Sequence, residues 1–332
     1  MSLKTAIIML TSTILLASCG NQKPRYEKVE PKNKSETTVK VRRYEQDLFS
    51  IPSDKLESQL PELQKQYSYF LGDETISEQQ YKRLYDYVTD PLIIELYDET
   101  KKIYPDNDWL NQEITSLFSY FSHYFPEKTI PEIYTYVSGI AYEHPVEYTG
   151  DVLIIALEMY LGSDFEPYQK AGIPAYQRNR MAKPYLKIDV SKAIAEHYLP
   201  SLATRGKLLD KMIHYGKQHY FADALMPQAH DTLKIKYSPE QLLWCKKSEK
   251  QLWAFIIENE LLFSGRQNKY KKLLSEGPFT SEFGKESPPR IGHWIGWQIV
   301  REFMENNPDI SLKEMMMIKD AQKILEKSGY KP

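Results

Sequence analysis

Val152-Leu-Ile-Ile-Ala-Leu157 is a short, almost entirely apolar run, and its length and composition predict a buried β-strand. Glu132-Ile-Tyr-Thr-Tyr-Val137 is rich in β-branched and aromatic residues and predicts a second strand. Tyr185-Leu-Lys-Ile188 is a third candidate strand. The alternating stretch Val39-Lys-Val-Arg-Arg43 marks where ordered structure should begin. So few strands predict a small sheet.

Helical patterns lie on both sides of these strands. Asp54 and Ser77 stand where helix N-caps are preferred, and Pro91 suits a first helical turn. The predicted helices begin at residues 54, 77, 91 and 108 in the first half, and in the second half cover 190–198, 208–215, a helix starting at 238, 250–263, 292–305 and 311–326. The predicted class is therefore α+β, helix-dominated, with a small sheet between helical halves and a single globular domain over residues 38–332.

The N-terminus has the layout of a secretory signal peptide over residues 1–18. Lys4 precedes an apolar stretch that is too short to span a bilayer comfortably, for which about 20 residues are needed. Leu16-Ala-Ser-Cys19 resembles the bacterial lipobox, which implies that Cys19 is acylated, with palmitate as an expected acyl group. Residues 19–37 are rich in Lys, Glu, Pro, Asn and Ser and predict a lipidated flexible tether.

A lipid on Cys19 would make the membrane the first partner of this chain. Each buried methylene contributes roughly 0.8 kcal/mol, and stable anchoring needs more than one acyl chain. Residues 20–25 contain no acidic residue, which favours the periplasmic face of the outer membrane. We therefore expect a lipid-anchored location in the cell envelope, with envelope proteins as further partners.

Composition and motifs exclude several functions. A net charge of -2 gives no nucleic-acid footprint, and no Gly-rich phosphate loop indicates a nucleotide. Of the two cysteines, Cys19 is taken by lipid, so Cys245 has no disulfide partner. The seven histidines show no spacing of three or four that would place two metal ligands on one helical face. We predict no metal, no cofactor and no catalytic residue.

Several stretches resemble the GldB family, the gliding-motility lipoproteins of the Bacteroidetes. They are Val41-Arg-Arg-Tyr-Glu-Gln-Asp-Leu-Phe49, Asp151-Val-Leu-Ile-Ile-Ala-Leu-Glu-Met-Tyr-Leu-Gly-Ser-Asp164, Leu208-Leu-Asp-Lys-Met-Ile-His-Tyr-Gly-Lys217, Asp223-Ala-Leu-Met-Pro227 and Pro289-Arg-Ile-Gly-His-Trp-Ile-Gly-Trp-Gln-Ile-Val300. The resemblance covers nearly the whole mature chain. It implies an accessory protein of surface gliding and of the secretion machinery linked to it.

That family is distantly similar to gluzincin-type zinc peptidases, which implies a degenerate zincin-like metallopeptidase scaffold. Those enzymes carry His-Glu-x-x-His on one helix and a Glu on the next. The matching segments here are Ala195-Glu-His-Tyr-Leu199 and His214-Tyr-Gly-Lys217. Glu196 would keep the place of the general base, whereas Ala195, Leu199 and Tyr215 would replace the three zinc ligands. His197 lies about 100° around the helix from the ligand position.

Two interpretations of these segments stay open. In one, Glu196, His197, His214 and Tyr215 belong to a pocket that has lost its metal. In the other, Glu196 is a solvated helix residue.

Arg290-Ile-Gly-His-Trp-Ile-Gly-Trp297 is a second candidate site. Gly292 and Gly296 are four apart and would open one helix face to close packing. Trp294 and Trp297 could line a groove for a peptide or glycan, with Arg290 offering its planar guanidinium to a carboxylate. The alternative is ordinary packing around two core tryptophans.

Three functions follow from these features. The chain is a non-catalytic accessory lipoprotein of the envelope, a metal-dependent peptidase or other hydrolase with unrecognised ligands, or a lipoprotein that binds a peptide or glycan. Bound zinc would separate the second from the others.

Overall fold

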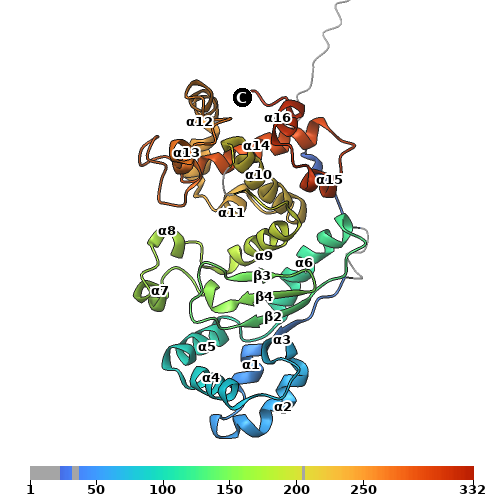
Figure 1. Cartoon of the computed structure of the whole chain (residues 1–332), viewed down its shortest axis with the longest axis vertical. Helices are drawn as coiled ribbons and strands as arrows, with labels where there is room; N and C mark the ends of the chain where they lie inside the picture. The colour runs from blue at the N-terminus through green and yellow to red at the C-terminus, as the bar shows by residue number, and fades with distance from the viewer. Residues whose placement is uncertain (1–22, 32–36, 204–205) are drawn as a thin grey trace, which may run out of the picture.

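The computed structural model describes residues 23–31, 37–203 and 206–332. The predicted signal peptide and the predicted lipidation site, Cys19, lie outside these described residues. Figure 1 shows a small sheet in the middle of an elongated molecule, with helices above and below it. This arrangement confirms the predicted helix-dominated α+β class.

The sheet has four strands in the order β1-β2-β4-β3. They are β1 (Val41–Arg43), β2 (Glu132–Tyr136), β3 (Val146–Tyr148) and β4 (Val152–Ala156). β2 pairs in parallel with β1 and β4, whereas β3 runs antiparallel to β4 and closes that edge. The apolar run at 152–157 therefore supplies a central strand, as predicted, because Leu153 and Ile155 are fully buried.

The predicted strand at Tyr185–Ile188 is wrong, since these residues lie in helix α9 (Lys183–Tyr198). Leu186, Val190 and Ile194 are spaced by four and are all fully buried. An even spacing of apolar residues fits one face of a strand as well as one face of a helix, and the helix is selected by its packing partners. α9 therefore starts seven residues earlier than predicted.

Six helices and one 3-10 helix form most of the N-terminal part. They are α1 (Tyr44–Phe49), η2 (Ser53–Lys55), α2 (Leu56–Gln66), α3 (Ser68–Leu71), α4 (Glu78–Thr89), α5 (Pro91–Ile103) and α6 (Asp108–Tyr124). Ser77 forms a capping box with Gln80, and Asp90 caps the helix that Pro91 opens. Asp54 is not an N-cap, because it lies inside η2 and the α-helix begins only at Leu56.

The remaining elements form the upper part of Figure 1 and one side of the sheet. They are η3 (Leu157–Tyr160), α7 (Glu166–Lys170), α8 (Ala175–Arg178), α9, α10 (Leu208–Leu225), α11 (Asp231–Ile235), α12 (Pro239–Glu258), α13 (Gln267–Leu274), α14 (Ile291–Asn306), α15 (Leu312–Met317) and α16 (Ala321–Ser328). The helix predicted to start at residue 238 is α12, and Ser238 caps it. The separate helix predicted over 250–263 is the second half of α12, and the helix predicted over 311–326 is divided into α15 and α16.

Helices α10 and α14 cross in backbone contact. A Cβ atom added at Gly216 would lie 2.2 Å from the carbonyl oxygen of Gly296, and one added at Gly296 would lie 1.8 Å from that of Met212. Only glycine allows this approach. The close packing predicted for Gly296 therefore exists, and it fixes the two helices that carry part of the candidate site.

The segment predicted as a tether is partly structured. Arg25–Lys28 form the 3-10 helix η1, and Tyr26 is only 6% exposed. The Tyr26 ring packs edge-on against Tyr220 of α10, with 5.9 Å between ring centroids. This aromatic contact therefore helps to dock a polar segment whose composition alone predicts flexibility.

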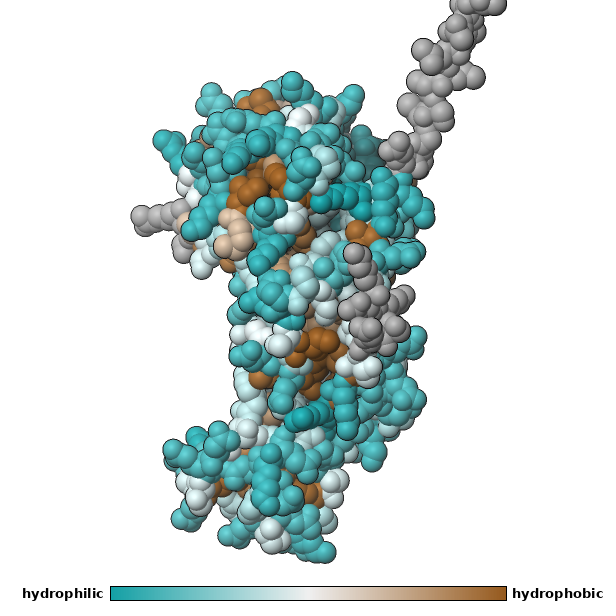
Figure 2. Space-filling view, turned by 90° about the vertical axis from the view of Figure 1, so that its right-hand side faces the viewer, coloured by the Kyte–Doolittle hydropathy of each residue, from teal (hydrophilic) through white to brown (hydrophobic). Residues whose placement is uncertain are grey.

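None of the described helices has the length and apolar character needed to cross a membrane. Figure 2 shows the side of the molecule at the right of Figure 1, which is mostly hydrophilic with separate small hydrophobic patches.

Candidate functional site

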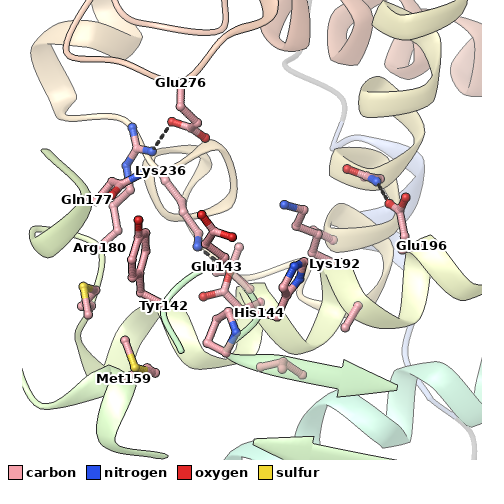
Figure 3. Close-up of a pocket in the computed structure, with 18 of the residues that line it drawn as sticks. Tyr142, Glu143, His144, Met159, Gln177, Arg180, Lys192, Glu196, Lys236 and Glu276 are labelled. Carbon is pink, nitrogen blue, oxygen red and sulfur yellow. Dashed lines mark hydrogen bonds and ion pairs between the residues drawn. The ribbon is translucent and has the colours of Figure 1, made fainter. Parts of the chain in front are cut away.

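A cleft of about 700 Å³ lies between the sheet and the C-terminal helices (Figure 3). Its walls come from the segment before β3, from α8 and α9, from α10, and from the start of α14. The apolar part of its lining includes Met159, Met181 and Ile188, which are 2%, 8% and 5% exposed. The cleft therefore joins an apolar surface to a set of charged groups.

Two arginines share one carboxylate at one end of the cleft. Arg180 donates from NH1 to Glu276 Oε2 over 2.9 Å, and Arg290 Nε lies 3.2 Å from Glu276 Oε1. Arg290 is only 6% exposed and also donates from NH2 to the carbonyl oxygen of Ile235. The two guanidinium groups lower the pKa of the Glu276 carboxyl, although burial acts in the opposite direction. This end of the cleft keeps an excess positive charge.

Two lysines extend the positive side. Lys236 forms an ion pair with Asp189, and Tyr160 donates to the other oxygen of that carboxylate over 3.0 Å. Burial lowers the pKa of Lys236, and Asp189 opposes this shift. Lys192, one turn of α9 after Asp189, is exposed and forms no ion pair within 4 Å among the described residues.

Two neutral histidines lie deeper in the cleft. Burial, aided by the positive charge of Arg290, lowers the pKa of His219 to about 3 and that of His293 well below its ordinary value. His293 stacks on Tyr215 with 3.8 Å between ring centroids. Its Nε2 atom is buried without a hydrogen-bond partner. The cleft thus holds an unfilled polar position.

Glu196 marks the other end of the cleft in Figure 3. Its side chain is 58% exposed, accepts a hydrogen bond from Gln218 and lies 3.7 Å from His214 Nε2. The interaction with His214 lowers the pKa of Glu196 despite partial burial. Glu196 of α9 thus lies beside His214 of α10, and Glu196 and Tyr215 line the cleft.

Of the other predicted site residues, Arg290 lines the cleft, whereas His197, Trp294 and Trp297 do not. His197 does not line the cleft and packs edge-on against Tyr148, with ring centroids 5.1 Å apart. Trp294 and Trp297 are 1% and 0% exposed, so they are core residues and cannot form a groove wall. Trp297 packs against His219 and donates to Asp223, both on α10, and Trp294 packs edge-on against Trp297. Arg290 does reach the cleft, but its side chain is held by the contacts with Glu276 and Ile235.

Ala195 and Leu199, the α9 residues at the zinc-ligand positions of the peptidase pattern, are 0% and 7% exposed and belong to the core. Within residues 23–31, 37–203 and 206–332, no three His, Cys, Asp or Glu side chains group as metal ligands.

Sequence reasoning did not find Arg180, Lys192, Lys236 or Glu276. They come from four segments with no common motif. One structural signal marks the region: Arg290 has a positive φ of 56°, which is uncommon outside glycine and directs its side chain into the cleft from the residue before α14.

The fold and the cleft define a class: a helix-dominated α+β protein with a charged cleft beside the edge of a small mixed sheet. The chain belongs to the family described as gliding motility protein GldB, whose model matches residues 26–332. Neither the curated proteins nor the solved structures contain a match to the chain. The resemblance to zinc peptidases therefore stays a prediction.

Proposed function

We propose that this protein is a lipid-anchored component of the bacterial cell envelope that serves gliding motility, or the secretion machinery linked to it, without catalysing a reaction. The family match over residues 26–332 carries the proposal. Anchoring through Cys19, a place on the periplasmic face of the outer membrane, and envelope proteins as partners are parts of the same proposal.

The helix pair α9 and α10 supports a non-catalytic role. A zinc peptidase presents two ligands from one helix to an open site. Here the corresponding residues, Ala195 and Leu199, are buried in the core, whereas Glu196 accepts a hydrogen bond from Gln218 and lies 3.7 Å from His214 Nε2. A carboxylate with a lowered pKa is also a weak general base at neutral pH.

Metal analysis of the full-length protein in detergent, combined with complementation of a deletion strain, tests the proposal. We expect far less than one zinc per chain. We expect Glu196→Gln to restore spreading of the colony as wild type does, and Cys19→Ser to fail although the protein is made. About one zinc per chain, together with a peptidase activity that Glu196→Gln abolishes, would establish the hydrolase instead.

The cleft favours a second role, the binding of a peptide or glycan. Its volume of about 700 Å³ is within the usual range of ligand pockets, and it combines apolar walls with a few charged groups. Such binding is compatible with an accessory function, since the ligand could belong to a partner protein.

A further inference from the structure

We infer that the cleft binds a peptide end through its C-terminal carboxylate. This inference deepens the proposed function and rests on its non-catalytic binding role. It is carried by three features of the cleft: surplus positive charge, buried hydrogen-bond acceptors without donors, and an apolar wall.

The surplus charge lies at the Arg180 end. Arg180 and Arg290 together have one acidic neighbour, Glu276, so their charges are not balanced. Both side chains are largely buried, at 13% and 7% exposure, which strengthens their attraction for an anion. A guanidinium group matches the two oxygens of a carboxylate.

Lys192 adds a second positive charge, which forms no ion pair within 4 Å among the described residues, although the carboxylates of Glu143 and Glu196 also line the cleft. It is exposed on α9, and it lowers the pKa of Glu196, of Glu276 and of His293. Its charge is therefore felt at both ends of the cleft. Figure 3 shows Lys192 between Glu196 and the group formed by Arg180 and Glu276.

Unsatisfied acceptors narrow the ligand class. His293 bonds the backbone of Leu274 with one ring nitrogen, and its Nε2 is buried without a partner, so in the neutral ring Nε2 is an acceptor. Gln177 Oε1, also in the cleft lining, is a second buried acceptor without a donor. Peptide N–H groups supply the missing donors next to a carboxylate, whereas a simple organic acid does not.

The apolar wall of the cleft favours a peptide over an acidic sugar as the ligand. Met159, Met181 and Ile188 line the cleft and offer no polar side-chain atom besides the two thioethers. Such a surface fits an apolar side chain near the peptide end better than the hydroxyl groups of a uronic acid.

Ligand-observed NMR on the full-length protein in detergent tests this inference. The probes are a mixture of N-acetylated tripeptides with free C-termini, the same mixture as C-terminal amides, and oligogalacturonate. We expect saturation transfer to the acids and at least about tenfold weaker binding of the amides. Lys192→Met and Arg180→Gln should weaken binding of the acids similarly.

Lys247→Met, which removes an exposed lysine of α12 outside the cleft, is the matched control and should bind as wild type does. Circular dichroism of each variant checks its fold. Equal binding of acids and amides, a preference for oligogalacturonate, or no binding at all would overturn the inference. Cleavage of a bound tripeptide would support the ligand class and refute the non-catalytic function.

A separate observation orients the molecule on the membrane, and we infer that the end formed by α14, α15 and η1 faces the bilayer. This inference rests on lipidation of Cys19. Arg25 is fixed to this end, because its backbone N–H donates to Glu305 over 2.6 Å and its NH1 donates to the carbonyl oxygen of Ile310 over 2.9 Å. Tyr26 is buried beside it.

The length of chain between Cys19 and the described residues limits how far this end can lie from the lipid. Three residues lie between Cys19 and Lys23, the first described residue, and the four Cα–Cα steps from Cys19 to Lys23 can span at most about 14 Å. The lipid therefore holds this end close to the bilayer. The lobe of α2 to α5 lies at the opposite end of the long axis and points away from the membrane, where a partner can reach it (Figure 1).

Fluorescence quenching by spin-labelled lipids tests this orientation in the native, lipidated chain. Asp309→Cys and Arg83→Cys each place a label on an exposed residue, beside η1 and on α4 respectively. We expect the label at residue 309 to be quenched several-fold more than that at residue 83. Equal quenching in a chain that stays membrane-bound would refute the orientation, whereas release of the chain by an alkaline wash would refute the anchor itself.

Discussion

Substitution of Gly296 by alanine should separate the two central helices. The added Cβ would lie 1.8 Å from the Met212 carbonyl oxygen, while ordinary contacts begin at 3.4 Å. The backbone must therefore retreat by about 1.6 Å, the difference between these two distances. Movement of a flexible side chain cannot relieve this clash, because the obstructing atoms belong to the backbone of α10.

The size of the effect follows from packing. Overfilling a core costs about 1–3 kcal/mol, and a clash with backbone lies at or above the top of that range. Alanine is better than glycine in a helix by about 1 kcal/mol, which offsets part of the cost. We expect a net loss of about 2–3 kcal/mol in the free energy of unfolding. For a chain of this size the melting temperature should fall by roughly 3–5 °C.

Urea unfolding followed by tryptophan fluorescence measures this change, since Trp294 and Trp297 lie on α14 in the core. Gly265→Ala is the matched control, because an added Cβ there meets nothing within 4 Å. It should change stability by less than about 0.5 kcal/mol. If Gly296→Ala proved as stable as wild type, or more stable by the helix-propensity gain, the close approach of α10 and α14 would be disproved.

Three further outcomes are expected. Glu158 is fully buried, and burial raises its pKa to about 7, so the folded state holds this proton more tightly than the unfolded state does. The free energy of unfolding should therefore fall as pH rises from about 4.5 to 7. In urea unfolding at pH 5 and pH 8, Glu158→Gln should remove up to roughly 3 kcal/mol of this loss, and an unchanged pH dependence would contradict the prediction. Asp223 accepts hydrogen bonds from Lys234, Arg301 and the Trp297 ring. Asp223→Ala should lower the free energy of unfolding by about 3–5 kcal/mol in denaturant unfolding, because it leaves buried cations unpaired. A loss below about 1 kcal/mol would show that this network is not needed for stability. Burial raises the pKa of the Cys245 thiol, so a thiol reagent should label it only after unfolding, and rapid labelling of the native protein would refute its burial.

Local sequence patterns predict a helix or strand well where a single residue type, such as an N-cap serine or a first-turn proline, sets its start. The N-caps at Ser77 and Ser238 and the proline at residue 91 are confirmed, because a helix start depends on a few neighbouring residues. The segment 185–188 was assigned wrongly because its spacing fits both helix and strand, and packing against the core decides between them. The docking of Tyr26 was missed for a related reason, since a polar stretch gives no hint of a distant aromatic partner.

The sequence by itself determined the α+β class, the central strand at 152–157 and the family resemblance, since all of these depend on short-range periodicity and on motifs that persist along the chain. The tertiary structure alone decided which side chains meet. Arg180, Glu276 and Arg290 come together across about a hundred residues, and Trp294 and Trp297 turn into the core rather than toward a ligand. The physical reason is that such encounters depend on how whole helices pack, as at the glycine crossing of α10 and α14, and no local propensity encodes that geometry.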